Sequence, residues 1–300
     1  MKGFLRVELR GGLGNQLFQY YAGAYLAHIY EKRLQVDQTH LYFNHERHVT
    51  ESVKPENNFL LKLSLPGEIL VRTGTSFWFE KVIRKVFDKT GYFTNNLLTP
   101  NIFFNSYDSK EIGYDEKLEL GHFNRIAGYF QTYRYYDELT KNNSSYIPKL
   151  KNASKWFEEM SKNIDVQSPI IIHIRKHYSW LDETFIQCDK EYYEKAIEKI
   201  DKLIGEKSIF VFGTEDLNVE SFIPKRYLAR CELVDKPTNT PDLESLILMS
   251  KGKALISANS TFSWWAGKLM INEAKIIVPG TIYKSRPNPK DYYPSNWIQI

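Results

Sequence analysis

Basic side chains gather at the end of a short apolar run in the second half of the chain. His173, Arg175 and Lys176 end or follow the run 170–172, and His177 comes next. Because the side chains of a strand alternate between its two faces, His173 and Arg175 share one side. An Arg side chain can hold two phosphate oxygens at once, whereas Lys acts as a point charge. The cluster predicts a phosphate site at a strand end; the alternative is a solvated basic loop.

A second polar cluster directly follows the apolar run 254–258. It consists of Asn259, Ser260, Thr261, Phe262 and Ser263. We expect a helix to begin here, so that free backbone N–H groups and the positive helix end add to four hydrogen-bonding side chains. Capping alone would use one of these side chains. The segment therefore predicts a pyrophosphate site.

A glycine-rich loop follows the first apolar run, 4–9. It reads Gly11-Gly12-Leu13-Gly14-Asn15-Gln16. Glycines let the backbone come close to a ligand at the start of a helix, and a tight turn without a ligand is the alternative. Leu17 stands where the dinucleotide fingerprint has its third glycine, yet Asp37, roughly twenty residues on, would suit a ribose hydroxyl. A nicotinamide-dependent oxidoreductase therefore stays open as an alternative.

An acidic pair follows another apolar run of the second half. Glu215 and Asp216 follow the apolar run 208–212, where they would accept hydrogen bonds from a base edge or a ribose, or cap a helix.

The chain contains no Asp-x-Asp pair, which metal-dependent glycosyltransferases use to hold the nucleotide diphosphate. A diphosphate site must then be neutralised by Arg, Lys and a helix end. The seven histidines include one His-x-x-x-His spacing, His173 and His177, but it falls at an expected strand end and not on a helix, and no metal site is expected.

Two sheets are needed to position these residues. In the second half, strands are expected at 170–174, 208–212, 231–235, 254–258 and 275–279, with helices at 192–204, from Pro241, and at 261–272. In the first half, a strand at 4–9 leads into a helix capped by Asn15 and running to about Lys32, and a strand follows at 34–37. Such alternation indicates parallel sheets, whose ligands bind at the carboxyl ends of the strands. The segment 44–151 is less regular, with one helix expected near 78–87.

Composition narrows the class of protein. The chain has 300 residues, two cysteines and a net charge of +4. These values fit one large domain or two ordinary ones, and they argue against a disulfide framework and against nucleic acid as a partner. Aromatic residues make up 15%; Phe18 and Trp264 should pack helices against sheets, whereas Tyr129, Phe130 and Tyr136 are candidates to stack on a sugar. No signal-peptide pattern and no apolar stretch of about 18 residues is visible, so a soluble protein in a reducing compartment is expected.

Three segments resemble glycosyltransferase family 11, the α-1,2-fucosyltransferases. They are residues 11–20, the segment His173-Ile174-Arg175, and residues 257–265, in the order and spacing of the family. The resemblance implies an α/β fold of the GT-B type, with two Rossmann-like domains, parallel sheets and an active-site cleft between the domains. Residues 1–150 would form the acceptor-side domain and residues 151–300 the GDP-binding domain, whose last helix would pack back on the first.

The resemblance also implies an activity. The expected reaction is an inverting, metal-independent transfer of L-fucose from GDP-β-L-fucose to the 2-hydroxyl of a terminal β-galactose, without a cofactor. The expected acceptor is a galactose-terminated oligosaccharide or a lipid-linked glycan of the O-antigen or capsule type. Bacterial members of this kind would work in the cytoplasm or at the cytoplasmic face of the inner membrane.

Roles in donor binding carry over to the matching positions. Arg175 would hold the donor phosphates and stabilise the departing GDP, with His173 and Lys176 beside it. Glu215 and Asp216 would face the guanine or the ribose. The other donor-binding positions implied are Gly12, Gly14, Asn259, Ser260, Thr261 and Phe262.

Roles near the reacting sugar carry over as well. Asn15 would lie in the active-site cleft close to that sugar, and Asn15 and Gln16 would meet the acceptor. Related fucosyltransferases place a carboxylate a similar distance after the basic motif, so Glu183 or Asp182 is the expected base for the acceptor hydroxyl. His177 is a weaker candidate, and a pair of exposed loop carboxylates is the alternative.

The chain departs from the family pattern at one place. The family reads His-x-Arg-Arg-x-Asp, and here Lys176 and Tyr178 replace the second Arg and the Asp. Lysine keeps the charge but loses the two-pronged geometry of Arg. Another GDP-sugar or another linkage is therefore an alternative, and a non-catalytic sugar-binding protein is an alternative of another class.

Overall fold

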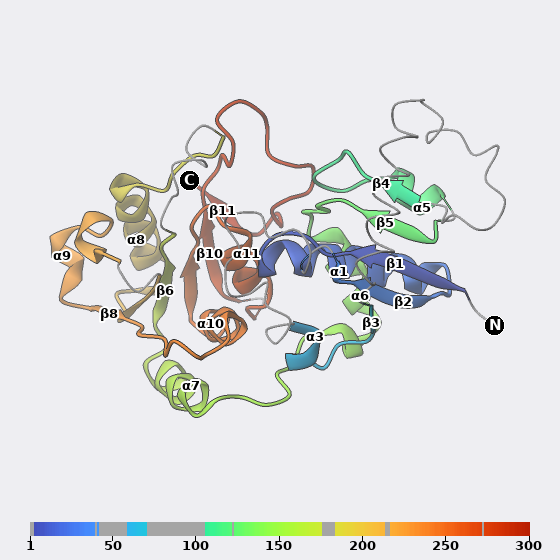
Figure 1. Cartoon of the computed structure of the whole chain (residues 1–300). Helices are drawn as coiled ribbons and strands as arrows, with labels where there is room; N and C mark the ends of the chain where they lie inside the picture. Colours follow the sequence, from blue (N-terminus) through green and yellow to red (C-terminus); the bar gives the residue numbers. More distant parts are fainter. Residues whose placement is uncertain are drawn as a thin grey trace. The chain divides into compact units, whose positions relative to one another are not determined.

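The chain divides into two compact units, Met1–Leu150 and Lys151–Ile300 (Figure 1). The structure is a computed structural model, and it describes residues 3–39, 41, 59–70, 106–121, 123–175, 184–213, 217–271 and 273–300. In the described part of the chain, each unit has one sheet of three or more strands, and the strand pairings of both sheets are parallel. Among the described residues, no helix is long and apolar enough to cross a membrane.

The sheet of the first unit has the order β3-β2-β1-β5-β4 in the described part of the chain. Its strands are β1 (Phe4–Glu8), β2 (Arg33–Asp37), β3 (Glu68–Leu70), β4 (Ser106–Asp108) and β5 (Arg125–Ala127). The first strand lies between β2 and β5, so the strand order reverses beside it. Loops that leave the carboxyl ends of β1 and β5 therefore meet at a switch point, the usual ligand position of such sheets.

One long helix covers a face of this sheet. Helix α1 (Leu13–Ile29) packs so closely that a Cβ at Gly23 would come within 2.7 Å of Val7, which explains glycine at this position. Its Tyr21 ring meets the Tyr136 ring of α6 (Arg134–Lys141) at 4.9 Å between centroids. The shorter helices are α3 (Phe59–Lys62), α5 (Lys117–Leu120) and the 3-10 turn Ser144–Tyr146.

The sheet of the second unit has the order β11-β10-β9-β6-β7-β8. Its strands are β6 (Ile170–His173), β7 (Ile209–Phe212), β8 (Cys231–Leu233), β9 (Ala254–Ile256), β10 (Lys275–Val278) and β11 (Ile298–Gln299). The chain runs outward from β6 to β8 and then returns to place β9 on the other side of β6. The switch point of this sheet therefore lies between β6 and β9.

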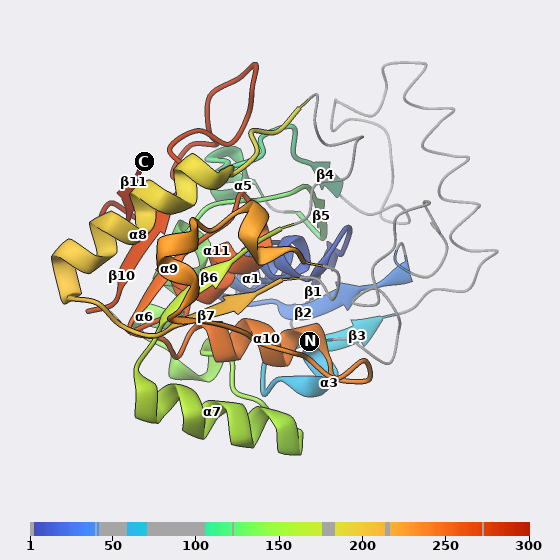
Figure 2. The same ribbon diagram turned by 90° about the vertical axis from the view of Figure 1, so that its left-hand side faces the viewer.

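Helices cover both faces of the second sheet. The buried side chains of α8 (Lys190–Ile204) include Ala196 and Ile197, which share a core cluster with Ile172 and Val211. On the opposite face, a Cβ at Gly267 of α11 (Thr261–Lys268) would lie 3.2 Å from Leu255. The other helices are α7 (Lys155–Gln167), α9 (Lys225–Leu228), α10 (Asp242–Met249) and the 3-10 turn Val219–Ser221. Figure 2 shows α7 beside α10.

The expected strands of both halves are confirmed, and four helix boundaries need correction. Gly12 precedes the first residue of α1 as its N-cap, so Asn15 lies inside the first turn instead of capping it. Helix α8 begins earlier than expected because the Asp189 carboxylate caps it. Pro241 is the N-cap of α10 and not its first residue, and α11 ends at Lys268 instead of reaching 272. The helix expected near 78–87 lies outside the described residues.

Two of the aromatic residues expected to stack on a sugar are instead part of the core. Phe18 and Trp264 are buried, as predicted for helix packing. Phe130 and Tyr136 are buried as well, at 0% and 9% exposure, so their rings belong to the core of the first unit and not to a sugar-stacking surface. Tyr129 is 48% exposed, so stacking of its ring on a sugar stays a prediction.

Candidate functional site

The two phosphate-binding clusters predicted in the second unit lie together. His173 ends β6 and Arg175 follows it, while Asn259 follows β9, the neighbouring strand. The guanidinium of Arg175 donates a hydrogen bond from Nη1 to the backbone carbonyl of Asn259 at 3.3 Å. The basic strand end therefore lies against the start of α11, at the switch point of the sheet.

His173 is a neutral, enclosed imidazole. Its side chain is 9% exposed, and its ring lies 5.7 Å from the Phe262 ring. Burial, together with the positive charge of Arg175, lowers the pKa of His173 to about 3. Within the described residues its Nδ1 has no hydrogen-bond partner. A neutral imidazole of this kind can offer one N–H to a ligand oxygen, but it carries no charge at neutral pH.

Most polar side chains at the start of α11 already make hydrogen bonds within the protein, which the sequence did not predict. Asn259 donates from Nδ2 to the carbonyls of Ile186 and Ile282, at 2.9 and 2.8 Å. The Ser260 hydroxyl caps α11 by accepting from the Phe262 N–H, and the Ser263 hydroxyl pairs with that of Ser257 at 2.8 Å.

The expectation that capping would leave most of this cluster available is therefore wrong. Three of its four hydrogen-bonding side chains hold the loop in shape, because the loop is buried and its polar groups need partners. Thr261 is the one for which the described part of the chain shows no side-chain bond. The groups left at this position for the predicted phosphate site are Thr261 and the backbone N–H groups at the start of α11, with Arg175 beside them.

Several predicted site residues lie outside the described residues. These are Lys176, His177, Asp182, Glu183, Glu215 and Asp216. The assignment of a carboxylate base and of an acidic pair facing guanine or ribose therefore stays a prediction.

The glycine loop of the first unit is stabilised by a hydrogen bond between its own residues. Gly11 has φ +71°, and a Cβ at this position would lie 2.9 Å from Nδ2 of Asn15. Gln16 is 1% exposed, and its Nε2 donates to the carbonyl of Gly11 at 2.8 Å. The side chain of Gln16 thus shapes the loop, and Gly14 is buried in the first turn of α1. Gly12 is exposed, and its carbonyl accepts a hydrogen bond from the Gln16 N–H at 3.1 Å.

Asn15 has a partner that the sequence analysis missed. Its Oδ1 accepts a hydrogen bond from Nε2 of Gln131 at 2.9 Å. Gln131 follows β5, the neighbour of β1, so the pair lies at the switch point of the first sheet. Strand β5 has three residues and begins with a charged one, which leaves no apolar periodicity to reveal it.

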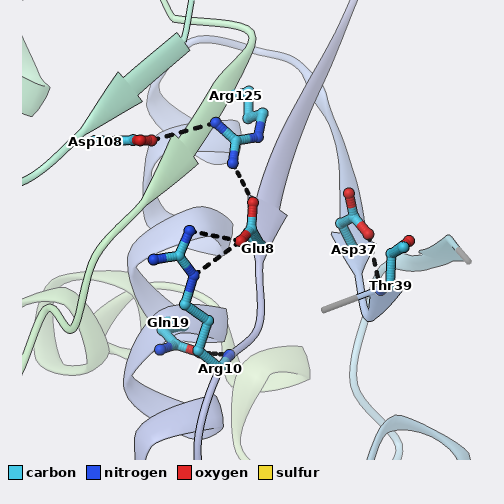
Figure 3. Close-up of polar contacts among 7 residues, drawn as sticks. All are labelled: Glu8, Arg10, Gln19, Asp37, Thr39, Asp108 and Arg125. Atoms are coloured by element: carbon cyan, nitrogen blue, oxygen red, sulfur yellow. Dashed lines mark hydrogen bonds and ion pairs between the residues drawn. The ribbon is translucent and has the colours of Figure 1, made fainter. Parts of the chain in front are cut away.

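A buried ion-pair network lies next to the same loop (Figure 3). Glu8 ends β1 and is 3% exposed; one carboxylate oxygen pairs with Arg125 of β5 and the other with Arg10, at 2.6 Å. Burial by itself would raise the pKa of Glu8, but the charges and hydrogen bonds of Arg125 and Arg10 lower it to about 2. Asp108 of β4 also pairs with Arg125, at 3.2 Å. The network fixes the chain immediately before the glycine loop.

Asp37 does not present its carboxylate to a ligand. It is 0% exposed, and its Oδ1 accepts from the Thr39 N–H at 2.9 Å (Figure 3). A ribose-binding carboxylate must face the ligand, so this geometry argues against the nicotinamide alternative. Within the described residues, no group of three or more His, Cys, Asp or Glu side chains could hold a metal ion.

Two Rossmann-like units with parallel sheets define an α/β protein of the GT-B type. A solved structure of a mutant FUT1 from Arabidopsis thaliana in complex with GDP aligns with a TM-score of 0.52, over 92% of this chain and 70% of that one, at 13% identity. The NodZ α-1,6-fucosyltransferase soaked with GDP-fucose aligns with a TM-score of 0.49, over 90% and 93%, at 15% identity.

The sequence comparisons are more specific. The profile of Glycosyl transferase family 11 matches residues 4–300, so the chain belongs to glycosyltransferase family 11. The Alpha-1,2-colitosyltransferase of Escherichia coli is 25% identical over 300 residues, covering 98% of this chain and 97% of the relative. The O-antigen biosynthesis glycosyltransferase WbnK of Escherichia coli is 33% identical over 116 residues, covering 37% and 36%.

Proposed function

We propose that this glycosyltransferase moves L-fucose from GDP-β-L-fucose to the 2-hydroxyl of a terminal β-galactoside, with inversion and without a metal. The observation that carries the proposal is the contact between Arg175 and the loop before α11, which places a fixed positive charge beside a helix start at the switch point. Such a site suits a diphosphate. The missing Asp-x-Asp pair supports neutralisation by protein cations.

The proposed chemistry assigns one task to each group. The acceptor oxygen attacks the anomeric carbon while the bond from that carbon to the diphosphate oxygen breaks, and GDP leaves. Arg175, helped by Lys176 and the backbone N–H groups before α11, stabilises the charge on the departing diphosphate. Glu183 or Asp182 takes the proton of the acceptor hydroxyl. No cofactor takes part.

The proposed acceptor is a galactose-terminated glycan, free or lipid-linked, of the O-antigen type. Support comes from the O-antigen role in the name of one relative, and we propose the cytoplasmic face of the inner membrane as the place of reaction. Gly12, Gly14 and Asn15 of the first unit would lie close to the reacting sugar.

A second donor is favoured by one specific observation. One relative that matches nearly the whole chain is named Alpha-1,2-colitosyltransferase, so its printed name points to a sugar other than fucose. The replacement of the family Arg and Asp by Lys176 and Tyr178 also alters the segment after β6. Transfer of colitose from its GDP derivative is therefore the second candidate.

The test is a transfer assay with purified protein. GDP-fucose, the GDP derivative of colitose and GDP-mannose are each offered with lactose and with β-galactosides, and the linkage of any product is determined by NMR. We expect an α-1,2-linked product from GDP-fucose, unchanged by EDTA. Preferred use of the colitose donor would select the second candidate. Absence of transfer from all three donors would refute both.

A thermal-shift assay separates the other classes. GDP should raise the melting temperature, because a ligand that binds only the folded state stabilises it. Stabilisation by NADH alone would favour an oxidoreductase, and stabilisation by lactose alone would favour a sugar-binding protein.

A further inference from the structure

The loop after β5 reaches the start of α1 through one side-chain hydrogen bond. Nε2 of Gln131 donates to Oδ1 of Asn15 at 2.9 Å, across 116 residues of sequence. Gln131 is 9% exposed, and Asn15 is half-buried. Both residues lie where β1 and β5 end side by side, at the switch point of the first sheet.

The backbone holds Gln131 firmly in this position. Its own N–H donates to the carbonyl of Ile112 at 2.5 Å, and the next N–H, of Thr132, donates to Phe130 at 2.8 Å. Phe130 is fully buried and has φ +52°, a left-handed conformation that costs free energy for a residue with a side chain. Such conformations persist where the surroundings over-determine them, and they gather at functional sites. The loop therefore presents Gln131 in one defined place.

In the bond between Gln131 and Asn15, Gln131 is the donor and Asn15 the acceptor, and this direction determines which end of the Asn15 amide a ligand can meet. A carboxamide has an oxygen that only accepts and a nitrogen that only donates. Because Gln131 occupies the oxygen of Asn15, the other end of the amide, Nδ2, is left for a ligand. This nitrogen lies beside Gly11, and in the described part of the chain it makes no hydrogen bond. Gly11 and Gly12 are exposed there, so a ligand oxygen can reach it.

We propose that Gln131 is a positioning residue, which orients Asn15 so that its N–H groups, and not its oxygen, face the substrate. The inference rests on the proposed function. In this orientation Asn15 donates to a hydroxyl or phosphate oxygen of the reacting sugar nucleotide or acceptor. A neutral carboxamide is also far too weak a base to take the proton of the attacking hydroxyl, so Asn15 acts in this proposal only as a donor.

Two variants of Gln131 test the direction of the bond. In Gln131→Glu the carboxylate can only accept, so it draws Nδ2 of Asn15 toward itself and turns the carboxamide around. In Gln131→Met the amide loses its partner and is free to rotate. We expect kcat to fall at least ~10-fold in both variants, and further in Gln131→Glu, the scale of one misdirected hydrogen bond.

A matched control variant distinguishes a loss of kcat caused by a misoriented Asn15 from one caused by lower stability of the fold. Tyr135→Phe removes another buried hydrogen bond of the same unit, the one in which Tyr135 accepts from the Asp115 N–H at 3.1 Å. It should lower the melting temperature but leave kcat unchanged. Asn15→Asp keeps the acceptor for Gln131 but loses the donors, so it should keep the melting temperature and lose kcat.

The experiments distinguish failure of this inference from failure of the proposed function. Wild-type kcat in Gln131→Glu would overturn the inference, because the reverse bond direction would then be the native one. An inactive wild-type chain would instead refute the proposed function. An NMR measurement stands apart from activity: the side-chain amide of Gln131 should exchange its protons more slowly than that of Asn15, and the opposite order would also overturn the inference.

Discussion

Arg175 and Asn259 join two loops that the sequence separates by 84 residues, through a hydrogen bond from Nη1 to a backbone carbonyl. The bond uses one edge of the guanidinium and is made to the backbone, so it depends on the loop shape and not on the identity of residue 259. The bond holds the guanidinium beside the start of α11. A planar, pre-oriented cation is what recognition of a diphosphate requires.

Replacing Arg175 should therefore damage turnover severely. For Arg175→Ala we expect kcat to fall at least ~100-fold, the scale of losing one charge contact to the transition state. Arg175→Lys should recover only part of the loss, because Lys lacks the planar geometry. Arg226→Ala is the control, since Arg226 forms exposed ion pairs with Glu194 and Glu198. Equal kcat in wild type and Arg175→Ala would refute the assigned role.

The glycine loop allows a test that leaves the fold intact. Gly12 has φ −70°, and a Cβ at this position meets nothing within 4 Å, so Gly12→Ala should cost only about 1 kcal/mol, the loss of a favourable N-cap residue. If substrate approaches the backbone here, the added methyl group should reduce kcat/KM at least ~10-fold. Gly3→Ala is the matched control, because the space beside Gly3 is equally open. Full activity in Gly12→Ala would exclude close approach of a ligand.

Glu8 should matter for stability. Glu8→Gln leaves the buried Arg125 without its main counter-charge, and breaking a buried pair in this way costs roughly 3 kcal/mol. Glu68→Gln is the control, because its pair with Arg33 is exposed and worth about 1 kcal/mol or less. Urea unfolding of both variants measures the difference. Similar losses in the two variants would show that the Glu8 network adds no stability.

The same carboxylate predicts the direction of a pH effect. The pKa of Glu8 is about 2 in the folded chain, below its ordinary value of 4.5. Its contribution is therefore complete above about pH 4.5 and is lost as the pH falls toward 2, because the unfolded chain takes up the proton first. Wild type should lose stability faster than Glu8→Gln over this interval. Parallel profiles would contradict the pKa shift.

The catalytic base can be identified by two amide substitutions. We expect kcat to fall at least ~100-fold in either Glu183→Gln or Asp182→Asn, because general-base catalysis contributes on this scale. The other variant should keep most of its activity, and the melting temperature of both should stay close to that of wild type. Near-normal kcat in both variants would remove these carboxylates from the mechanism.

The strands β6 and β9, which carry the candidate site, could be predicted because they are short and uniformly apolar. Residues 170–172 and 254–256 are buried on both faces of the sheet, and such strands read as unbroken apolar runs. Strand β5 could not be found in this way, since the buried Arg125 interrupts the pattern and is tolerated only because Glu8 pairs with it. Helix α7 was missed because only Ile164 of its residues is buried.

The place of Arg175 could be predicted from the sequence, but the hydrogen-bond partners of the polar side chains near it could not. The position of Arg175 follows from a strand end, and the structure places it beside the predicted loop. The roles of Asn259 and Ser263 depend on carbonyl and hydroxyl groups brought close by the fold, at Ile186, Ile282 and Ser257. No local pattern encodes such partners, and the same reason explains why Gln131 was missed.

The parallel pairing of β1 with β5 has a consequence for folding. Strand β1 forms one of its two ladders with a strand that is synthesised more than a hundred residues later, and the Glu8–Arg125 pair spans 117 residues. Contacts between such distant segments require closure of a long chain loop before they contribute any free energy, which slows folding. The first unit should therefore reach its native state late during synthesis on the ribosome, and its glycine loop should take shape only after β5 has docked.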